Sequence, residues 1–286
     1  MSVRNFPALG RARVIGIVNV TPDSFSDGGR FDSPDSAVRA GLQMLNEGAD
    51  VLDVGGESTR PGAARVSEAD ERARVLPVVA GLVAAGARVS VDTARASIAE
   101  AALDAGAVLV NDVSGGADPA MFPLIAERGV PYVLMHSRGP SSDMTARAVY
   151  RDLVREVTVE LGARLHAAAA AGIVEDQLVL DPGVGFAKTA DHNWTLLAML
   201  DRLYALGRPL LLGTSRKSFL GALLADVDGV PRPVDERDDA TQATTALIAA
   251  AGVWGVRVHA VRPAADAVRV AAALLSARRS AGREGR

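Results

Sequence analysis

The sequence contains no cysteine, which excludes disulfide bonds and thiolate-ligated metal sites. A chain without cysteine fits a reducing compartment, and we expect this protein in the cytoplasm. Charge of neither sign dominates, because 31 Lys and Arg side chains are set against 34 Asp and Glu, giving a net charge of −3. This balance gives no indication of a nucleic-acid partner.

Long hydrophobic runs are also absent. The longest nearly apolar stretch, residues 75–87, contains a proline and falls short of the roughly 20 residues that a membrane-spanning helix needs. The first residues lack the apolar core of a signal peptide, so we expect no membrane partner. Residues 277–286 are polar, basic and glycine-containing, and we expect them to form a disordered tail.

Glycine marks a unit that repeats along the chain. Seven times a helical stretch ends at a glycine, and a short run rich in Val, Ile and Leu follows before the chain turns polar. Glycine suits a helix C-terminus because it adopts the left-handed conformation without a Cβ clash. The apolar runs suit strands buried on both faces of a parallel sheet. These glycines are Gly48, Gly86, Gly106, Gly129, Gly172, Gly207 and Gly252.

With the strand that ends at Asn19, the chain has eight strand signals and no mark of a domain boundary. Eight strand–helix units in one domain, residues 1–286, predict an α/β fold of the (β/α)8 TIM-barrel type, which typically needs roughly 250 residues. A doubly wound open sheet is the alternative, although it usually has fewer strands. Ser33-Pro34 and Asp118-Pro119 each predict a helix start. Residues 225–239 are expected to be a loop before a further helix.

Polar side chains follow the predicted strands, at the end of a barrel where active sites lie. Cationic side chains stand beside or just beyond them, which favours a phosphorylated ligand over a set of helix caps. The stretch "GTSRKSFLG" lacks the Walker spacing, and the four histidines lack zinc-binding spacing, so Mg²⁺ bridging phosphate oxygens is the better expectation. The strand-end residues are Asn19, Asp53, Asp92, Asn111, His136, Asp181, Ser215 and His259, and the cations are Arg60, Lys188, Arg216, Lys217, Arg257 and His259.

Seven motifs in order make a resemblance specific. They are "NVTPDSFSDGG", "DVGGESTRPG", "VSVDT", "VNDVSGG", "LDPGVGFAKT", "GTSRKSF" and "VRVH", and the likeness runs from about Val14 to Ala272. The chain resembles the dihydropteroate synthases, folate-pathway enzymes that sulfonamides target. The resemblance implies a (β/α)8 barrel and a transferase that condenses 6-hydroxymethyl-7,8-dihydropterin diphosphate with p-aminobenzoate, giving 7,8-dihydropteroate and pyrophosphate. It also implies a homodimer.

The same resemblance assigns roles by matched position. The pterin would be held by Asp92, Asn111, Met135, Asp181, Gly213 and Lys217. The diphosphate would be bound by Asn19, Thr59, Arg60, Lys217, Arg257 and His259, with Asn19 acting through Mg²⁺. The pocket for p-aminobenzoate would be lined by Phe25, Thr59, Arg60, Pro61, Phe186 and Ser218. The catalytic set would be Asp23, Asp92, Asp181 and Lys217.

Two loops, residues 21–29 and 57–62, are expected to close over the aminobenzoate and exclude water. Two other functions remain open. A non-catalytic pterin-binding paralogue should have lost residues from "NVTPDSFSDGG" or "SRKS", and no such departure is present. A pterin-dependent corrinoid methyltransferase would need no diphosphate site, so Arg257 and His259 argue against it.

Overall fold

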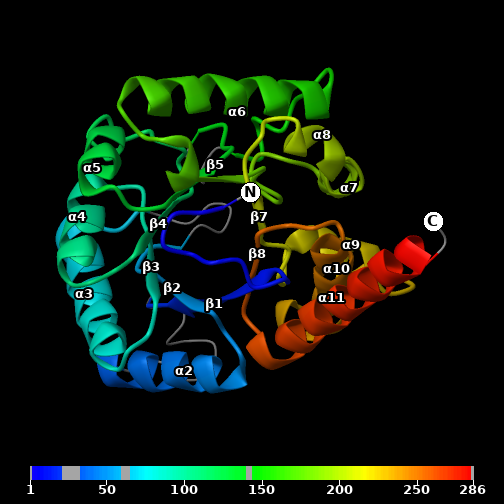
Figure 1. The fold of residues 1–286 in the computed structure, drawn as a ribbon, viewed down its shortest axis with the longest axis horizontal. Coiled ribbons are helices and arrows are strands. Elements are labelled where there is room, and N and C mark those ends of the chain that lie inside the picture. Colours follow the sequence, from blue (N-terminus) through cyan, green and yellow to red (C-terminus); the bar gives the residue numbers. More distant parts are fainter. Residues whose placement is uncertain (1, 21–32, 59–64, 140–143, 285–286) are drawn as a thin grey trace.

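The computed structural model describes residues 2–20, 33–58, 65–139 and 144–284, and strands and helices alternate along it as predicted (Figure 1). The strands are β1 (Arg13–Asn19), β2 (Val51–Gly55), β3 (Val89–Asp92), β4 (Leu109–Asp112), β5 (Tyr132–Met135), β6 (Leu178–Asp181), β7 (Leu211–Leu212) and β8 (Gly255–Val258). The α-helices are α2 (Pro34–Glu47), α3 (Glu68–Ala84), α4 (Ala96–Asp104), α5 (Met121–Arg128), α6 (Leu153–Ala170), α7 (Ala190–Ala198), α8 (Leu200–Tyr204), α9 (Ser218–Leu223), α10 (Asp238–Ala250) and α11 (Val261–Glu284). Short 3-10 turns are η1 (Glu175–Gln177) and η2 (Val234–Glu236).

The eight strands form one parallel sheet in the order β6-β5-β4-β3-β2-β1-β8-β7. The two ends of this order meet, because Leu180 of β6 bridges Leu210, the residue before β7, and its N–H donates to the Pro209 carbonyl at 2.8 Å. The sheet is therefore nearly closed, and the helices surround it (Figure 1). This confirms the predicted (β/α)8 barrel.

The repeating glycines have the conformation that the sequence predicts. All seven have positive φ angles, from 65° at Gly129 to 109° at Gly48. Ser33 caps α2 through its hydroxyl, which accepts the N–H of Ser36, and Pro34 is the first helical residue. The second predicted helix start is wrong by two residues: α5 begins at Met121 instead of Pro119, because the Asp118 carboxylate accepts the N–H groups of Ala96 and Ala120 in a turn.

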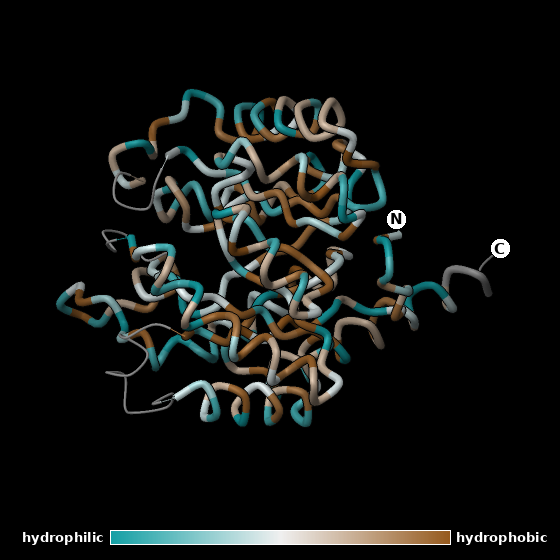
Figure 2. The backbone as a smooth tube through the Cα atoms, turned by 90° about the vertical axis from the view of Figure 1, so that its left-hand side faces the viewer, coloured by the Kyte–Doolittle hydropathy of each residue, from teal (hydrophilic) through white to brown (hydrophobic). Residues whose placement is uncertain are grey.

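Two apolar layers account for the core. One lies between the strands and the helices, and Figure 2 shows it as brown segments inside, with hydrophilic helix faces outside. The other fills the barrel interior near the strands' N-terminal ends. Its members come from six strands and the preceding segments: Val3, Phe6, Ile15, Val51, Leu109, Val133, Val179, Leu211 and Trp254. The interior is therefore sealed by apolar side chains at this end, where Arg13 also lies, and the polar side chains at the carboxyl ends of the strands lie at the other.

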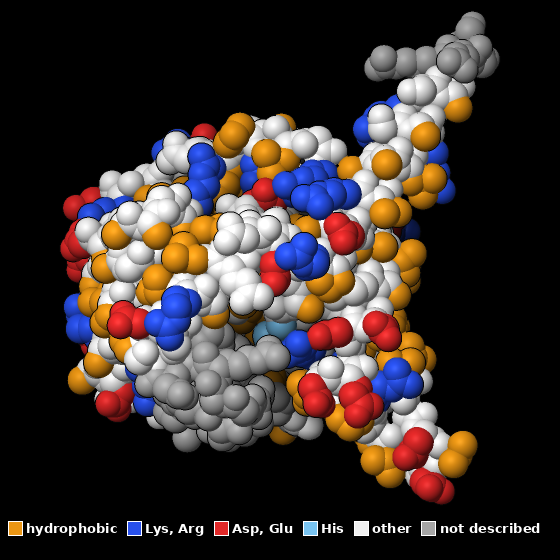
Figure 3. All heavy atoms as spheres, turned by 90° about the horizontal axis from the view of Figure 1, so that it is seen from below, with side chains coloured by type: hydrophobic (Ala, Val, Ile, Leu, Met, Phe, Trp, Pro, Cys, Tyr) orange, Lys and Arg blue, Asp and Glu red, His pale blue; other side chains and the backbone are white. Residues whose placement is uncertain are grey.

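The C-terminal segment differs from its prediction. Helix α11 continues through Glu284, so residues 277–284 are helical instead of a disordered tail. The Ala-, Leu- and Arg-rich composition of residues 271–279 explains this, because these residues are strong helix formers. The end of this helix projects beyond the barrel (Figure 3). None of the helices in the described ranges is long and apolar enough to cross a membrane.

Candidate active site

Strand alternation places the predicted pterin residues on one inward-facing layer. Asn111 and Asp181 each lie two positions beyond an apolar interior residue of their own strand, Leu109 and Val179, and Asp92 lies two positions beyond the buried Ser90. Met135 follows Val133 in the same way and pairs in register with Asp181. Two residues along each strand thus separate the sealed apolar end from a polar chamber at the carboxyl ends.

Arg257 lies at the centre of this chamber. Its Nε donates to Oδ2 of Asp53 at 2.6 Å, and its Nη2 donates to Oδ2 of Asp92 at 2.6 Å. The amide of Asn111 donates to the same Asp53 oxygen at 2.9 Å. These contacts join β8, β2, β3 and β4, which are not all neighbours, so the side chains meet across the barrel interior.

The charged groups of this cluster shift one another's pKa values. Burial raises the pKa of Asp92 to about 7, although Arg257 opposes the shift. Burial alone would lower the pKa of Arg257, but Asp53 and Asp92 more than offset it, and the pKa is raised overall. Asp92 can therefore gain or lose a proton near neutral pH while Arg257 stays charged.

Asp181 and Lys217 form a second group beside the first. The Asp181 Oδ1 accepts the N–H of Gly183 at 2.7 Å, and the Lys217 ammonium donates to the Val184 carbonyl. Burial raises the pKa of Asp181 against the opposing charge of Lys217. Burial also lowers the pKa of Lys217 to about 8. A carboxylate acceptor and an ammonium donor thus lie on the same side of the polar chamber.

Phe186 and Gly213 border the same ammonium. The Lys217 Nζ lies 4.9 Å from the centre of the Phe186 ring, a cation–π contact. A methyl group added at Gly213 would lie 3.5 Å from the Arg257 Cβ and 3.9 Å from Lys217 Nζ, so the glycine leaves the wall between them flat. Ser218 follows Lys217 and is exposed.

His259 and Ser215 close the chamber on the side of β8. The Ser215 hydroxyl and the His259 Nδ1 are 2.9 Å apart, and the same hydroxyl accepts the His259 N–H at 3.2 Å. Arg216 does not stand beside them as expected. Its guanidinium forms a two-bond ion pair with Asp238 of α10, at 2.8 and 2.7 Å. A left-handed backbone at Arg216, with φ of 58°, turns the side chain that way.

Several predicted residues lie outside the described ranges: Asp23, Phe25, Thr59, Arg60 and Pro61. The attachment points of the second loop are described. Arg95 donates to Glu57 at 3.0 Å and to the Val66 carbonyl at 2.6 Å, so one guanidinium contacts both flanks of that loop. Asn19, the predicted magnesium ligand, ends β1 and is half-buried.

Sequence reasoning did not predict two parts of the site. Asp53 was recognised as a strand-end acid, but its pairing with Arg257 spans 204 residues and left no local signal. A chain of contacts from Glu160 through His136 to Lys188 was also not expected. His136 lies between them, 3.0 Å from each. Only the strand-end position of His136 could have indicated it.

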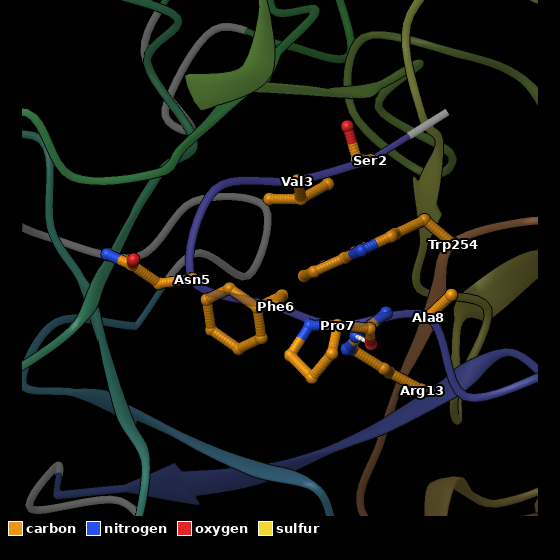
Figure 4. Close-up of a pocket in the computed structure, with 8 residues that line it drawn as sticks. All are labelled: Ser2, Val3, Asn5, Phe6, Pro7, Ala8, Arg13 and Trp254. Carbon is orange, nitrogen blue, oxygen red and sulfur yellow. Dashed lines mark hydrogen bonds between the residues drawn. The ribbon is translucent and has the colours of Figure 1, made fainter.

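A cavity of about 630 Å³ lies at the opposite end of the barrel and is unrelated to this chemistry. Phe6, Pro7, Arg13 and Trp254 border it (Figure 4). The Arg13 guanidinium stacks 5.4 Å from the Phe6 ring centre and 5.1 Å from that of Trp254. The described residues that line it include no carboxylate and no carboxyl end of a strand, so the polar chamber is the better candidate for catalysis.

Residues 15–259 match the family model described as "Pterin binding enzyme". The chain is 56% identical over 272 residues to a dihydropteroate synthase of Mycobacterium leprae, covering 94% of this chain and 96% of that one. A Yersinia pestis dihydropteroate synthase in a sulfonamide drug complex superposes with a TM-score of 0.89 at 40% identity, over 96% of this chain and 99% of that chain. The dihydropteroate synthase of Xanthomonas albilineans in complex with 7,8-dihydropteroate gives a TM-score of 0.83 at 41% identity, over 94% and 95% of the two chains.

The chain is a (β/α)8 barrel with hydrogen-bond acceptors and cations at the carboxyl ends of its strands, and the family match makes it a pterin-binding enzyme. Within that class, the identities and the nearly complete coverage are decisive. The chain belongs to the dihydropteroate synthase family.

Proposed function

We propose that the chamber condenses 6-hydroxymethyl-7,8-dihydropterin diphosphate with p-aminobenzoate, giving 7,8-dihydropteroate and pyrophosphate. The observation that carries this is the inward layer that holds Asp92, Asn111, Asp181 and Arg257 at one barrel end. Family membership supports it, as does the 7,8-dihydropteroate complex of the Xanthomonas albilineans relative.

The pterin is held by the acceptors of the inner layer. Its 2-amino and ring N–H groups form a donor edge that the Asp181 carboxylate can accept as a pair. Asp92 and Asn111 contact the other ring atoms, and Met135 and Gly213 supply apolar surface. Lys217 donates to the ring from the wall that Phe186 covers.

The diphosphate lies above the pterin, toward Arg257 and His259. Two nitrogens of Arg257 already donate to Asp53 and Asp92, which leaves Nη1 for a phosphate oxygen. Lys217 lies on the same side. Thr59 and Arg60 complete this group in the proposal.

Asn19 is the residue proposed to hold Mg²⁺. Among the residues with described positions, there is no group of three His, Asp or Glu side chains that could hold a metal ion. A half-buried amide at a strand end nevertheless fits Mg²⁺, which keeps several waters and binds mainly through substrate phosphates. When bound, the ion would neutralise diphosphate charge. Measuring the affinity of the protein for pyrophosphate with and without Mg²⁺ tests whether the ion binds there.

The arylamine pocket is bordered by Phe186 and by the Ser218 hydroxyl, which is exposed and can meet a carboxylate. Phe25, Thr59, Arg60 and Pro61 are proposed for its other side. This arrangement brings the amine toward the pterin methylene from the side opposite the inner acceptors.

The reaction needs no enzyme nucleophile. The methylene–oxygen bond can break as pyrophosphate leaves, since the pterin ring stabilises the positive charge on the methylene carbon. Arg257, His259 and Lys217 stabilise the leaving anion, and Asp92 and Asp181 stabilise the cation. The Lys217 amine is bound to a carbonyl, which suits a hydrogen-bond donor better than a Schiff-base lysine. Asp23 is proposed to assist from the first loop.

The cationic side chains proposed to bind the diphosphate distinguish this reaction from that of the methyltransferase alternative, which needs no diphosphate site. Measuring pyrophosphate release with both substrates, and with each omitted, tests the proposal. Release that requires p-aminobenzoate and yields dihydropteroate is expected. Pterin binding without release would favour the non-catalytic paralogue.

The proposal includes a homodimer in the cytoplasm. Its support is the family resemblance and the absence of cysteine. On the face shown in Figure 3, acidic and basic side chains are interspersed, as expected for a protein without a nucleic-acid partner. Light scattering in solution tests the dimer.

A further inference from the structure

Only two of the 31 cationic side chains are lysines, Lys188 and Lys217, and the other 29 are arginines. Both lysines donate to main-chain carbonyls of one loop, residues 182–187, which follows β6. An ammonium is a compact charge with three donors, whereas a guanidinium is a broad planar fork. A chain that otherwise uses arginine thus has its two compact cations at a single loop, and the reaction described so far uses only Lys217.

This loop has an unusual backbone. Gly183 and Gly185 have φ angles of 69° and 82°, and Ala187 has φ of 48°, which is unfavourable for a residue with a Cβ. Such a conformation persists only where the surroundings hold it. The N–H of Gly185 donates to Asn193 at 2.7 Å, and the Tyr150 hydroxyl donates to the Ala187 carbonyl at 3.1 Å.

Lys188 supplies a further contact. Its Nζ donates to the Phe186 carbonyl at 3.0 Å and to the His136 Nδ1 at 3.0 Å. When Lys188 is an ammonium it has no lone pair, so Nδ1 is then the acceptor and the imidazole is neutral. The proton on Nε2 then points to Glu160, 3.0 Å away. Burial lowers the pKa of His136 to about 3, which keeps the imidazole neutral.

The chain of contacts ends on α6. The single N–H of the Arg138 Nε is shared between the two Glu160 carboxylate oxygens, at 3.2 and 3.1 Å, so the carboxylate that orients His136 is itself fixed. Lys188 therefore connects the Phe186 carbonyl to α6, through His136 and Glu160. From the other side, Lys217 donates to the Val184 carbonyl and stacks on the Phe186 ring.

We propose that Lys188 is a positioning residue of the reaction: it fixes the Phe186 carbonyl and so keeps the Phe186 ring against Lys217 as a wall of the arylamine pocket. This rests on the proposed function, which assigns Phe186 to that pocket. Lys188 touches neither substrate.

The cost of burying Lys188 agrees with this role. Burial lowers its pKa to about 7, against the opposing charge of Asp181. A buried ammonium is unfavourable compared with an apolar side chain of the same length. Packing alone would therefore favour a methionine here.

Lys188→Met tests the proposal, with steady-state kinetics in both substrates. The KM for p-aminobenzoate should rise about tenfold, because a misplaced wall weakens one pocket. The KM for the dihydropterin diphosphate should stay within about twofold, because Asp181 and Lys217 remain. The matched control Arg155→Met removes an exposed cation from α6 and should change neither constant.

Tyr150→Phe is the second variant. It removes one hydrogen bond to the same loop and no charge, and it should raise the p-aminobenzoate KM by a smaller factor, about twofold to threefold. If Lys188→Met does not fold, the p-aminobenzoate KM of Tyr150→Phe tests the proposal in its place.

An unchanged p-aminobenzoate KM, or an equal rise in both constants, overturns the inference. Absence of dihydropteroate formation by the wild type would instead contradict the proposed function. In that case the calorimetric affinity for p-aminobenzoate, compared between wild type and Lys188→Met, still tests the role of Lys188.

Discussion

Each end of the barrel interior holds an arginine, and the two are stabilised differently. Arg13, at the sealed end, stacks between Phe6 and Trp254 and donates to the Pro7 carbonyl. Burial lowers its pKa. Arg257, at the open end, is bound by two carboxylates that raise its pKa.

The difference shows what each end is for. Aromatic faces and a carbonyl neutralise no charge, so Arg13 serves packing over the apolar interior. Two carboxylates hold Arg257 in place and leave one of its nitrogens for an anion. The same residue type therefore closes the barrel at one end and serves a ligand at the other.

Arg257→Met should have the largest effect. It removes a diphosphate partner and leaves two buried carboxylates uncompensated, so kcat/KM should fall about a thousandfold and the free energy of unfolding by about 3 kcal/mol. Kinetics and urea unfolding measure these. Equal affinity losses for the diphosphate ester and for a pterin lacking phosphates would make Arg257 purely structural. Adding Asp53→Asn should restore stability but not activity.

Asp181→Ala should abolish detectable pterin binding at ordinary concentrations. Losing a buried charged acceptor costs about 2–4 kcal/mol, or roughly 30- to 1000-fold in affinity. Calorimetry with a pterin analogue measures it, and Asp238→Ala, which disturbs only the Arg216 pair, is the control. Unchanged affinity would refute the placement of the pterin at β6.

Acidification should weaken pterin binding through Asp92. Its pKa of about 7 means that the folded protein protonates this group well above the pH at which the unfolded chain does. The folded state then holds the extra proton between about pH 4 and 7, so this group's contribution to stability decreases as pH rises through that window. Affinity for a pterin analogue should fall up to about tenfold per pH unit below 7. In Asp92→Asn this dependence should disappear; its persistence would point to another group.

Arg13→Met should have the smallest effect. An apolar side chain of similar length offsets the lost cation–π contacts, so the free energy of unfolding should change by less than about 1 kcal/mol. We expect kcat/KM within twofold of wild type. A large loss of activity would mean that the two barrel ends are coupled, and the comparison above would fail.

The sequence predicted what depends on local chemistry. Helix-ending glycines and buried strands indicated the barrel, and the polar residues that end the strands, Asp92 and Asp181 among them, indicated a site at its carboxyl end. It did not predict where Arg216 turns, because its partner Asp238 lies on a later helix. Nor did it predict the Arg257 pairs, since the partners lie 165 and 204 residues away and only barrel closure brings them together. The helical end of α11 was missed because polarity was given more weight than helix propensity.

The scarcity of lysine has a consequence for chemical modification. Amine-reactive esters and acetylating enzymes ignore arginine, so the side-chain amines open to them are confined to Lys188 and Lys217. Both have lowered pKa values, of about 7 and 8, and carry an appreciable free-amine fraction near neutral pH. Acylation of this protein's side-chain amines would therefore be directed to the two lysines that hold the loop at residues 182–187, and protection of Lys217 by bound pterin would report occupancy without any engineered label.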